Sequence, residues 1–273
     1  MKYMKQKKSI HVIISVLVLL VGIIFTAESS LYYLGNPKVV SAQTTKDQDK
    51  NSKVKKNEGK KNKDYTIVID AGHQRHANSK KEPIGPGAKE KKAKVSSGTQ
   101  GKYTKVPEYQ VTLDVAKKLS DILKKKGYHV VMIRTKNDVN ISNAERAKIA
   151  NDNHADVFVR IHCNGSTNTK VYGTETLCQT KNNKYCKKYY KSSRKLSESI
   201  VNSLCKEVGS KNNGVVETDS MSGINWAKVP VSIVEMGYMT NKAEDKKLTN
   251  LNYQKKLATG IANGIEVYLG KKK

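Results

Sequence analysis

The sequence predicts a single α/β domain built on a mainly parallel, twisted sheet of about six strands, with helices on both faces. Short runs of β-branched residues alternate along the chain with longer segments in which apolar residues recur at helical spacing. Within the short runs the apolar residues are consecutive, which is typical of strands covered on both faces. Strands that alternate with helices of this length indicate parallel strands joined by crossover helices.

The predicted strands comprise four strong apolar runs and two weaker ones. The strong runs are rich in Val and Ile, which suit a buried and pleated surface. The strong runs are Tyr65–Asp70, His129–Ile133, Asp156–Ile161 and Val231–Val234, and the weaker candidates are Val171–Leu177 and Gly214–Thr218.

The predicted helices are recognised by their start and stop signals. Pro107 suits the first turn of a helix, because that turn does not use the missing N–H. Ser142 and Glu145 form a capping box, which marks another helix start. The predicted helices run from about Pro107 to Gly127, from Ser142 to Asn153, from Leu196 to Gly209 and from Asn252 to Tyr268.

The first 63 residues differ in composition from the rest of the chain. Basic residues precede an uncharged apolar run, so residues 1–27 are predicted to be a signal peptide or an N-terminal membrane anchor. Residues 28–63 are a predicted Lys-rich flexible linker, because the stretch Thr44–Lys63 contains too little apolar surface to offset the entropy of ordering. Residues 64–273 form the predicted globular domain. The export segment predicts that this domain lies on the extracellular or cell-wall side, either secreted or tethered.

The charge balance favours a polyanionic partner. Lys and Arg total 51 against 24 Asp and Glu, which gives a net charge of +27. Such a charge suits anionic wall polymers or a membrane surface, contacted through the Lys-rich linker. Nucleic acid is not an expected partner, because the sequence has an export segment and no recognised nucleic-acid-binding motif. We expect a monomer.

The four cysteines give no metal-cluster or redox motif. Cys163, Cys178, Cys186 and Cys205 include no C-x-x-C pair. Free and partly buried thiols are expected, and a Cys178–Cys186 disulfide across a short loop is the alternative for an exported protein.

Three predicted strands lead directly into a residue that can bind metal or transfer a proton. These residues are His73, His162 and Glu235. The carboxyl ends of parallel strands meet at one edge of a sheet, so the three side chains are expected to converge. Two imidazoles and one carboxylate are a common ligand set of hydrolytic zinc sites, with one position left for water.

The identity of the carboxylate ligand is open on spacing alone. Glu82, Glu90 and Glu108 all lie between the first two strands, and His76 is near enough in sequence to replace His73. Glu108 has one advantage, since it occupies the first turn of a predicted helix near the same edge of the sheet.

Four short motifs occur in the order and at intervals similar to those of a known family. They are Ile69–His73, Pro107–Tyr109, Ile161–Asn164, and Val234–Tyr238 followed by Asn241. On these motifs the chain, from about Tyr65 to Leu269, resembles the zinc-dependent N-acetylmuramoyl-L-alanine amidases, which have a single α/β catalytic domain. Glu82–Gly87 is similar to the variant loop of clostridial-type members. Gln74–Asn78 replaces the family's glycine-rich continuation after the first histidine.

The resemblance implies a function and a role for each site residue. His73, Glu108 and His162 correspond to the zinc ligands, and Glu235 corresponds to the catalytic glutamate. The expected reaction is hydrolysis of the amide between N-acetylmuramic acid and L-alanine of peptidoglycan by a zinc-activated water. The alternative for Glu235 is a structural carboxylate paired with a lysine. The alternative functions are a zinc peptidase acting on the stem peptide and a non-catalytic or partner-activated wall-binding protein.

Overall fold

The sheet confirms the predicted architecture. In the computed structural model, which describes residues 61–272, six strands form one sheet in the order β4-β1-β5-β8-β6-β7. The strands from β4 to β8 are parallel, whereas β6 is antiparallel to β8 and β7 is parallel to β6. The strands are β1 Thr66–Ala71, β4 His129–Met132, β5 Val157–Asn164, β6 Thr174–Cys178, β7 Asn212–Glu217 and β8 Val231–Tyr238.

Helices cover both faces of this sheet. Each predicted helix is present, although the one expected from Leu196 begins earlier, at Tyr190. Two short helices, α4 and α5, were not predicted. The helices are α1 Glu108–Lys125, α2 Asn143–Asp152, α3 Tyr190–Val208, α4 Ser222–Asn225, α5 Lys242–Leu248 and α6 Leu251–Tyr268, with 3₁₀ turns at Asn62–Asp64 and Lys187–Tyr189.

Neighbouring residues of the central strands point into two separate apolar layers. Ile67 and Ile69 of β1 belong to the layer formed with α1, α3 and α6. Val68 faces the other way, into a layer that contains Ala147 of α2 and Ile224 of α4. The consecutive apolar residues of the central strands are therefore explained by burial on both faces.

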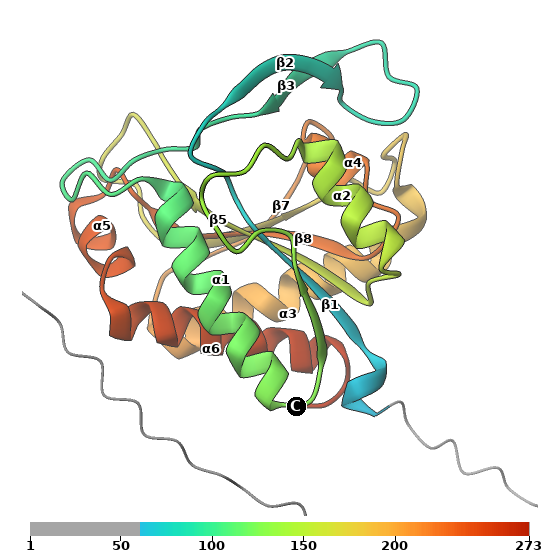
Figure 1. Cartoon of the computed structure of the whole chain (residues 1–273). Coiled ribbons are helices and arrows are strands. Elements are labelled where there is room, and N and C mark those ends of the chain that lie inside the picture. Colours follow the sequence, from blue (N-terminus) through green and yellow to red (C-terminus); the bar gives the residue numbers. More distant parts are fainter. Residues whose placement is uncertain (1–60, 273) are drawn as a thin grey trace, which may run out of the picture. The chain divides into compact units, whose positions relative to one another are not determined.

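A two-stranded antiparallel hairpin, β2 (Asn78–Pro83) and β3 (Lys91–Val95), lies outside the main sheet (Figure 1). Its strands are mainly Lys, Ser and Glu, so the sequence has no apolar run to reveal them. The indole Nε1 of Trp226 donates to the Pro83 carbonyl at 2.9 Å, and Asn143 Nδ2 donates to the Lys94 carbonyl at 2.9 Å. The hairpin is thus held against the start of α2 and the end of α4.

All four cysteines are buried free thiols, as expected, and the alternative Cys178–Cys186 disulfide is not formed. Burial raises the pKa of Cys178 to about 11 and that of Cys186 to about 12. Both thiols are therefore protonated and poorly nucleophilic near neutral pH.

The predicted signal peptide or anchor, 1–27, and linker residues 28–60 lie outside the described residues. Within residues 61–272, no helix is both long enough and apolar enough to cross a membrane.

Candidate metal centre and active site

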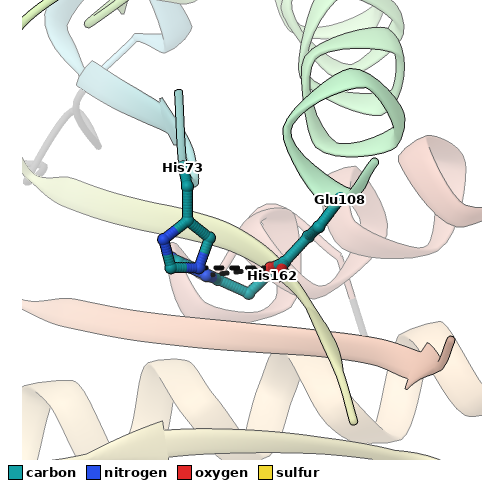
Figure 2. A group of neighbouring side chains, drawn as sticks. All are labelled: His73, Glu108 and His162. Atoms are coloured by element: carbon teal, nitrogen blue, oxygen red, sulfur yellow. Dashed lines mark ion pairs between the residues drawn. The ribbon is translucent and has the colours of Figure 1, made fainter. Parts of the chain in front are cut away.

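Three of the predicted site residues come together at the carboxyl edge of the parallel strands. His73 follows β1 by two residues, and His162 lies near the end of β5. Glu108 is the first residue of α1, after Pro107 at the N-cap position. One potential ligand atom from each of the three side chains lies within 4.8 Å of the others (Figure 2).

Glu108 is the carboxylate at the centre of this group. Its Oε1 lies 3.5 Å from Nε2 of His73 and 3.3 Å from Nδ1 of His162 (Figure 2). The other candidate ligands are elsewhere. Glu82 accepts a hydrogen bond from the Ala144 N–H at the start of α2, while Glu90 and His76 are exposed.

Backbone donors hold both oxygens of Glu108. Cys163 N–H donates to Oε1 at 3.0 Å, and Thr99 N–H donates to Oε2 at 2.8 Å. Burial alone would raise the pKa of Glu108, but hydrogen bonds from His162 and His73 outweigh it and hold the pKa well below its usual value. The carboxylate is therefore ionised, which is the form that binds a cation.

The surroundings of the two histidines suit metal binding. Nδ1 of His73 lies 3.1 Å from the carbonyl oxygen of Ser96 and 2.9 Å from its hydroxyl, and these contacts hold the ring so that Nε2 faces Glu108. Burial lowers the pKa of His162 to about 4, so its ring is neutral at neutral pH. Nε2 of His162 is buried without a hydrogen-bond partner among the described residues. Two imidazoles and one carboxylate fit the preferences of zinc.

Two glycines leave no room for a side chain beside His73, Glu108 and His162. A Cβ on Gly72 would lie 2.1 Å from Cε1 of His162. A Cβ on Gly98 would lie 2.6 Å from both Glu108 Oε2 and His73 Cδ2, and Gly98 also has a left-handed φ of +78°. The segment after β3 that carries Ser96, Gly98 and Thr99 therefore supports the ligand group. Sequence reasoning missed this support, because it did not predict the hairpin.

Glu235 lies on β8 directly beside His162, its register partner on β5. Both residues line a cavity of about 290 Å³, together with His73. Oε2 of Glu235 is buried and has no hydrogen-bond partner, and no lysine forms an ion pair with Glu235 within residues 61–272. Burial, with the nearby charges of Glu108 and Glu175, raises the pKa of Glu235 well above its usual value. The structure thus gives no support to the alternative of a structural ion pair.

A buried charge cluster beneath the cavity was not predicted. Asp70, at the end of β1, pairs with Arg146 of α2 at 2.5 Å and with Arg160 of β5 at 2.9 Å. Burial opposes ionisation of Asp70, but the two guanidinium groups hold its pKa well below its usual value. Arg146 also donates to the His73 carbonyl at 3.1 Å, so the cluster ties α2 to the loop that carries His73.

A further carboxyl group, also unpredicted, stands next to Glu235. Glu175 of β6 is the antiparallel register partner of Glu235, and it accepts a hydrogen bond from Asn164 Nδ2 at 2.8 Å. Burial raises the pKa of Glu175. No sequence signal marks it, because β6 was only a weak candidate and its position opposite β8 depends on strand order.

The fold and the site together define a class of α/β hydrolase with a candidate metal centre at the carboxyl edge of its sheet. The family model described as N-acetylmuramoyl-L-alanine amidase matches residues 67–267, so the chain belongs to this amidase family. The family is generally zinc-dependent, in agreement with a His-Glu-His group that can hold a metal ion. The resemblance seen in the four sequence motifs is confirmed.

Individual relatives agree with the family match. The chain is 31% identical over 163 residues to N-acetylmuramoyl-L-alanine amidase LytC of Bacillus subtilis, covering 59% of this chain and 31% of LytC. It is 30% identical to an N-acetylmuramoyl-L-alanine amidase from Clostridium difficile 630 of known crystal structure, with a TM-score of 0.61, covering 77% of this chain and 98% of that one. Ami1 of Mycobacterium smegmatis shares the fold, with a TM-score of 0.71 at 22% identity, covering 78% of this chain and 100% of that one.

Proposed function

We propose that this chain is a peptidoglycan hydrolase that cleaves the amide bond between N-acetylmuramic acid and L-alanine. The observation that carries the proposal is the buried Oε2 of Glu235, which has no hydrogen-bond partner within residues 61–272 and lies in the same cavity as His73 and His162. A buried carboxyl without a partner is costly, so its retention beside a candidate metal site favours a chemical role.

We assign the metal to His73, Glu108 and His162. A zinc ion in this position would lower the pKa of a bound water molecule and polarise the carbonyl of the scissile amide. The backbone donors on Glu108 and the Ser96 contact of His73 hold these ligands in place before the ion binds.

Glu235 is the proposed proton carrier. Its Oε2 accepts a proton as water attacks the amide carbon and then delivers that proton to the departing amine of L-alanine. The apolar layer behind β8 and the closeness of Glu108 and Glu175 both favour the protonated form needed for the second step.

We propose further that residues 1–27 direct or tether the protein to the outer side of the membrane and that residues 28–63 are a flexible basic spacer. The spacer's lysines suit adhesion to anionic wall polymers or to the membrane surface. The export segment and the lack of a recognised nucleic-acid-binding motif argue against nucleic acid as a partner, and we propose that the protein acts as a monomer.

The test is digestion of isolated peptidoglycan by the purified protein, with the new termini identified by mass spectrometry. We expect released peptides with free L-alanine amino groups, loss of this product with a chelator and its recovery with zinc. New termini inside the stem would instead establish a peptidase. Tight binding to the wall without any cleavage in the presence of zinc would establish the wall-binding alternative.

A further inference from the structure

Arg160 is a buried arginine in the wall of the proposed active-site cavity. It precedes His162 by two residues on β5, so the two side chains lie on the same face of the sheet. Arg160 is only 4% exposed, yet it lines the same cavity as His162 and Glu235. An arginine at such a depth needs partners for its charge and for each of its donors.

The hydrogen-bond partners of Arg160 use only two of the three nitrogen atoms of its guanidinium group. Nε donates to Asp70 at 2.9 Å, and Nη2 donates to the Asn143 side-chain oxygen at 2.8 Å. Within residues 61–272, Nη1 donates to no protein group, and it is not among the atoms closed off from solvent. The open donor therefore belongs to the cavity.

Gly223 keeps this donor accessible. A Cβ on Gly223 would lie 1.9 Å from Nη1 of Arg160, so any other residue would displace the guanidinium group. The contact places the start of α4 directly beside the free donor. A glycine here lets the arginine reach the cavity.

The cluster of Asp70, Arg146 and Arg160 also carries an excess of positive charge, which favours binding of an anion. Arg146 and Arg160 share one carboxylate, that of Asp70, which leaves a net charge of about +1 in a buried place. Asn143 contributes only a neutral amide oxygen. An anionic group in the cavity would complete the pairing of this charge, with a bond stronger than one to a neutral acceptor.

We propose that Nη1 of Arg160 binds a carboxylate of the substrate's stem peptide, on the second residue after the cleaved bond. This inference rests on the proposed amidase function. Arg160 and His162 are two positions apart on β5, which is about 7 Å along a strand. A carboxylate on the second residue of an extended peptide lies at a similar distance of about 7 Å from the amide that precedes the first residue. Arg160 is thus a specificity-determining residue that selects stems with a free carboxyl at this position.

The experiment compares two soluble muropeptides that differ only at the α-carboxyl of the second stem residue, which is free in one and amidated in the other. For the wild type we expect kcat/KM to be at least about 10-fold higher for the free acid, mainly through KM, because a charge-assisted hydrogen bond is lost in the amide. In Arg160→Gln the preference should fall to within about twofold. Equal kinetics of the wild type on both muropeptides would overturn the proposal and leave the amidase function intact.

A matched control separates binding from structural support. Arg146 pairs with the same aspartate but does not line the cavity. Arg146→Lys should lower the unfolding temperature and keep the preference for the free acid. If Arg146→Lys loses the preference as Arg160→Gln does, the carboxylate site is contradicted.

A measurement on the wild type needs no variant that might fail to fold. Dipeptides of L-alanine and D-glutamate, with the α-carboxyl free or amidated, are titrated into the protein in a calorimeter. We expect at least about 10-fold tighter binding of the free acid. This result would support the carboxylate site even if neither muropeptide were cleaved, an outcome that would count against the amidase function alone.

Discussion

The two faces of the central sheet both carry a buried apolar layer, but at the carboxyl end of β5 they carry opposite kinds of residue. On the face covered by α1, α3 and α6, β5 contributes Val159 and Ile161 to an apolar layer. On the other face the alternate residues of the same strand are Arg160 and His162, which meet Asp70 and Glu235 from the neighbouring strands. The side chains of β5 thus pack in the apolar core on one face and line the active-site cavity on the other. Substitutions on the two faces should therefore have separate effects on stability and on activity.

The largest expected effect is on the chemical face, at Glu235. Glu235→Gln keeps the shape of the side chain but removes the proton carrier, so kcat should fall by about 10²- to 10⁴-fold. Zinc affinity and unfolding temperature should stay close to those of the wild type. Turnover on peptidoglycan and a zinc titration of the same sample check both points. Full turnover of the variant would contradict the proposed proton transfer.

The opposite result is expected on the packing face. Ile261 of α6 is fully buried in the apolar layer, so Ile261→Ala should lower the free energy of unfolding by about 2–5 kcal/mol. The activity of the folded fraction should not change, because the side chain lies in the layer that does not line the cavity. Urea denaturation and kcat at low temperature provide the measurements. A large drop in kcat under conditions where the variant is fully folded would show that the packing face also affects catalysis.

The parts of the fold and of the site that could be predicted from the sequence are those marked by local patterns along the chain. The strands and main helices follow from local patterns, because burial on both faces makes runs such as Ile67–Ile69 continuously apolar. His73, His162 and Glu235 were expected to converge because each ends or closely follows such a run, and the structure brings them to one cavity.

What escaped prediction depends on contacts between distant segments. The hairpin β2–β3 has no apolar pattern, so the Ser96 and Thr99 contacts to the ligand group could not be anticipated. Glu108 could be chosen over its rivals only through family resemblance. Asp70, Arg146 and Arg160 come from three separate elements, and only the fold shows that they share one buried pairing.

A pH-dependent effect should also arise on the chemical face in the metal-free protein. The pKa of His162 is lowered to about 4 by burial, whereas the unfolded chain has an ordinary value of about 6.5. The unfolded state therefore binds the extra proton first, and stability should fall as the pH drops from about 6.5 to about 4, by on the order of 3 kcal/mol.

Urea denaturation of the metal-free protein across this range measures the effect. His162→Asn should flatten the profile between about pH 6.5 and 4.5. The pKa values of Asp70 and Glu108 are lowered in the folded protein. The loss of folding stability caused by protonating these two groups should therefore appear only below about pH 4. A flat wild-type profile down to pH 4.5 would contradict the buried neutral imidazole.

The smallest expected effect compares two glycines with similar backbone conformations. Gly98 and Gly87 both have a left-handed φ, but only Gly98 has neighbours where a Cβ would stand, namely Glu108 and His73. Gly98→Ala should weaken zinc binding by about 10- to 100-fold, as expected for loss of ligand support. Gly87→Ala should have the same backbone cost and unchanged zinc affinity. Equal zinc affinities of the two variants would show that the segment after β3 does not position the ligands.

The central claim is that His73, Glu108 and His162 bind the metal ion of this amidase, and X-ray absorption at the zinc edge tests it most directly. The expected result for the zinc-loaded wild type is a shell of nitrogen and oxygen ligands at about 2.0–2.2 Å, with no sulfur. His162→Ala should lose this ion. A ligand at about 2.3 Å, as from the thiol of Cys163, or no bound zinc at all would contradict the claim.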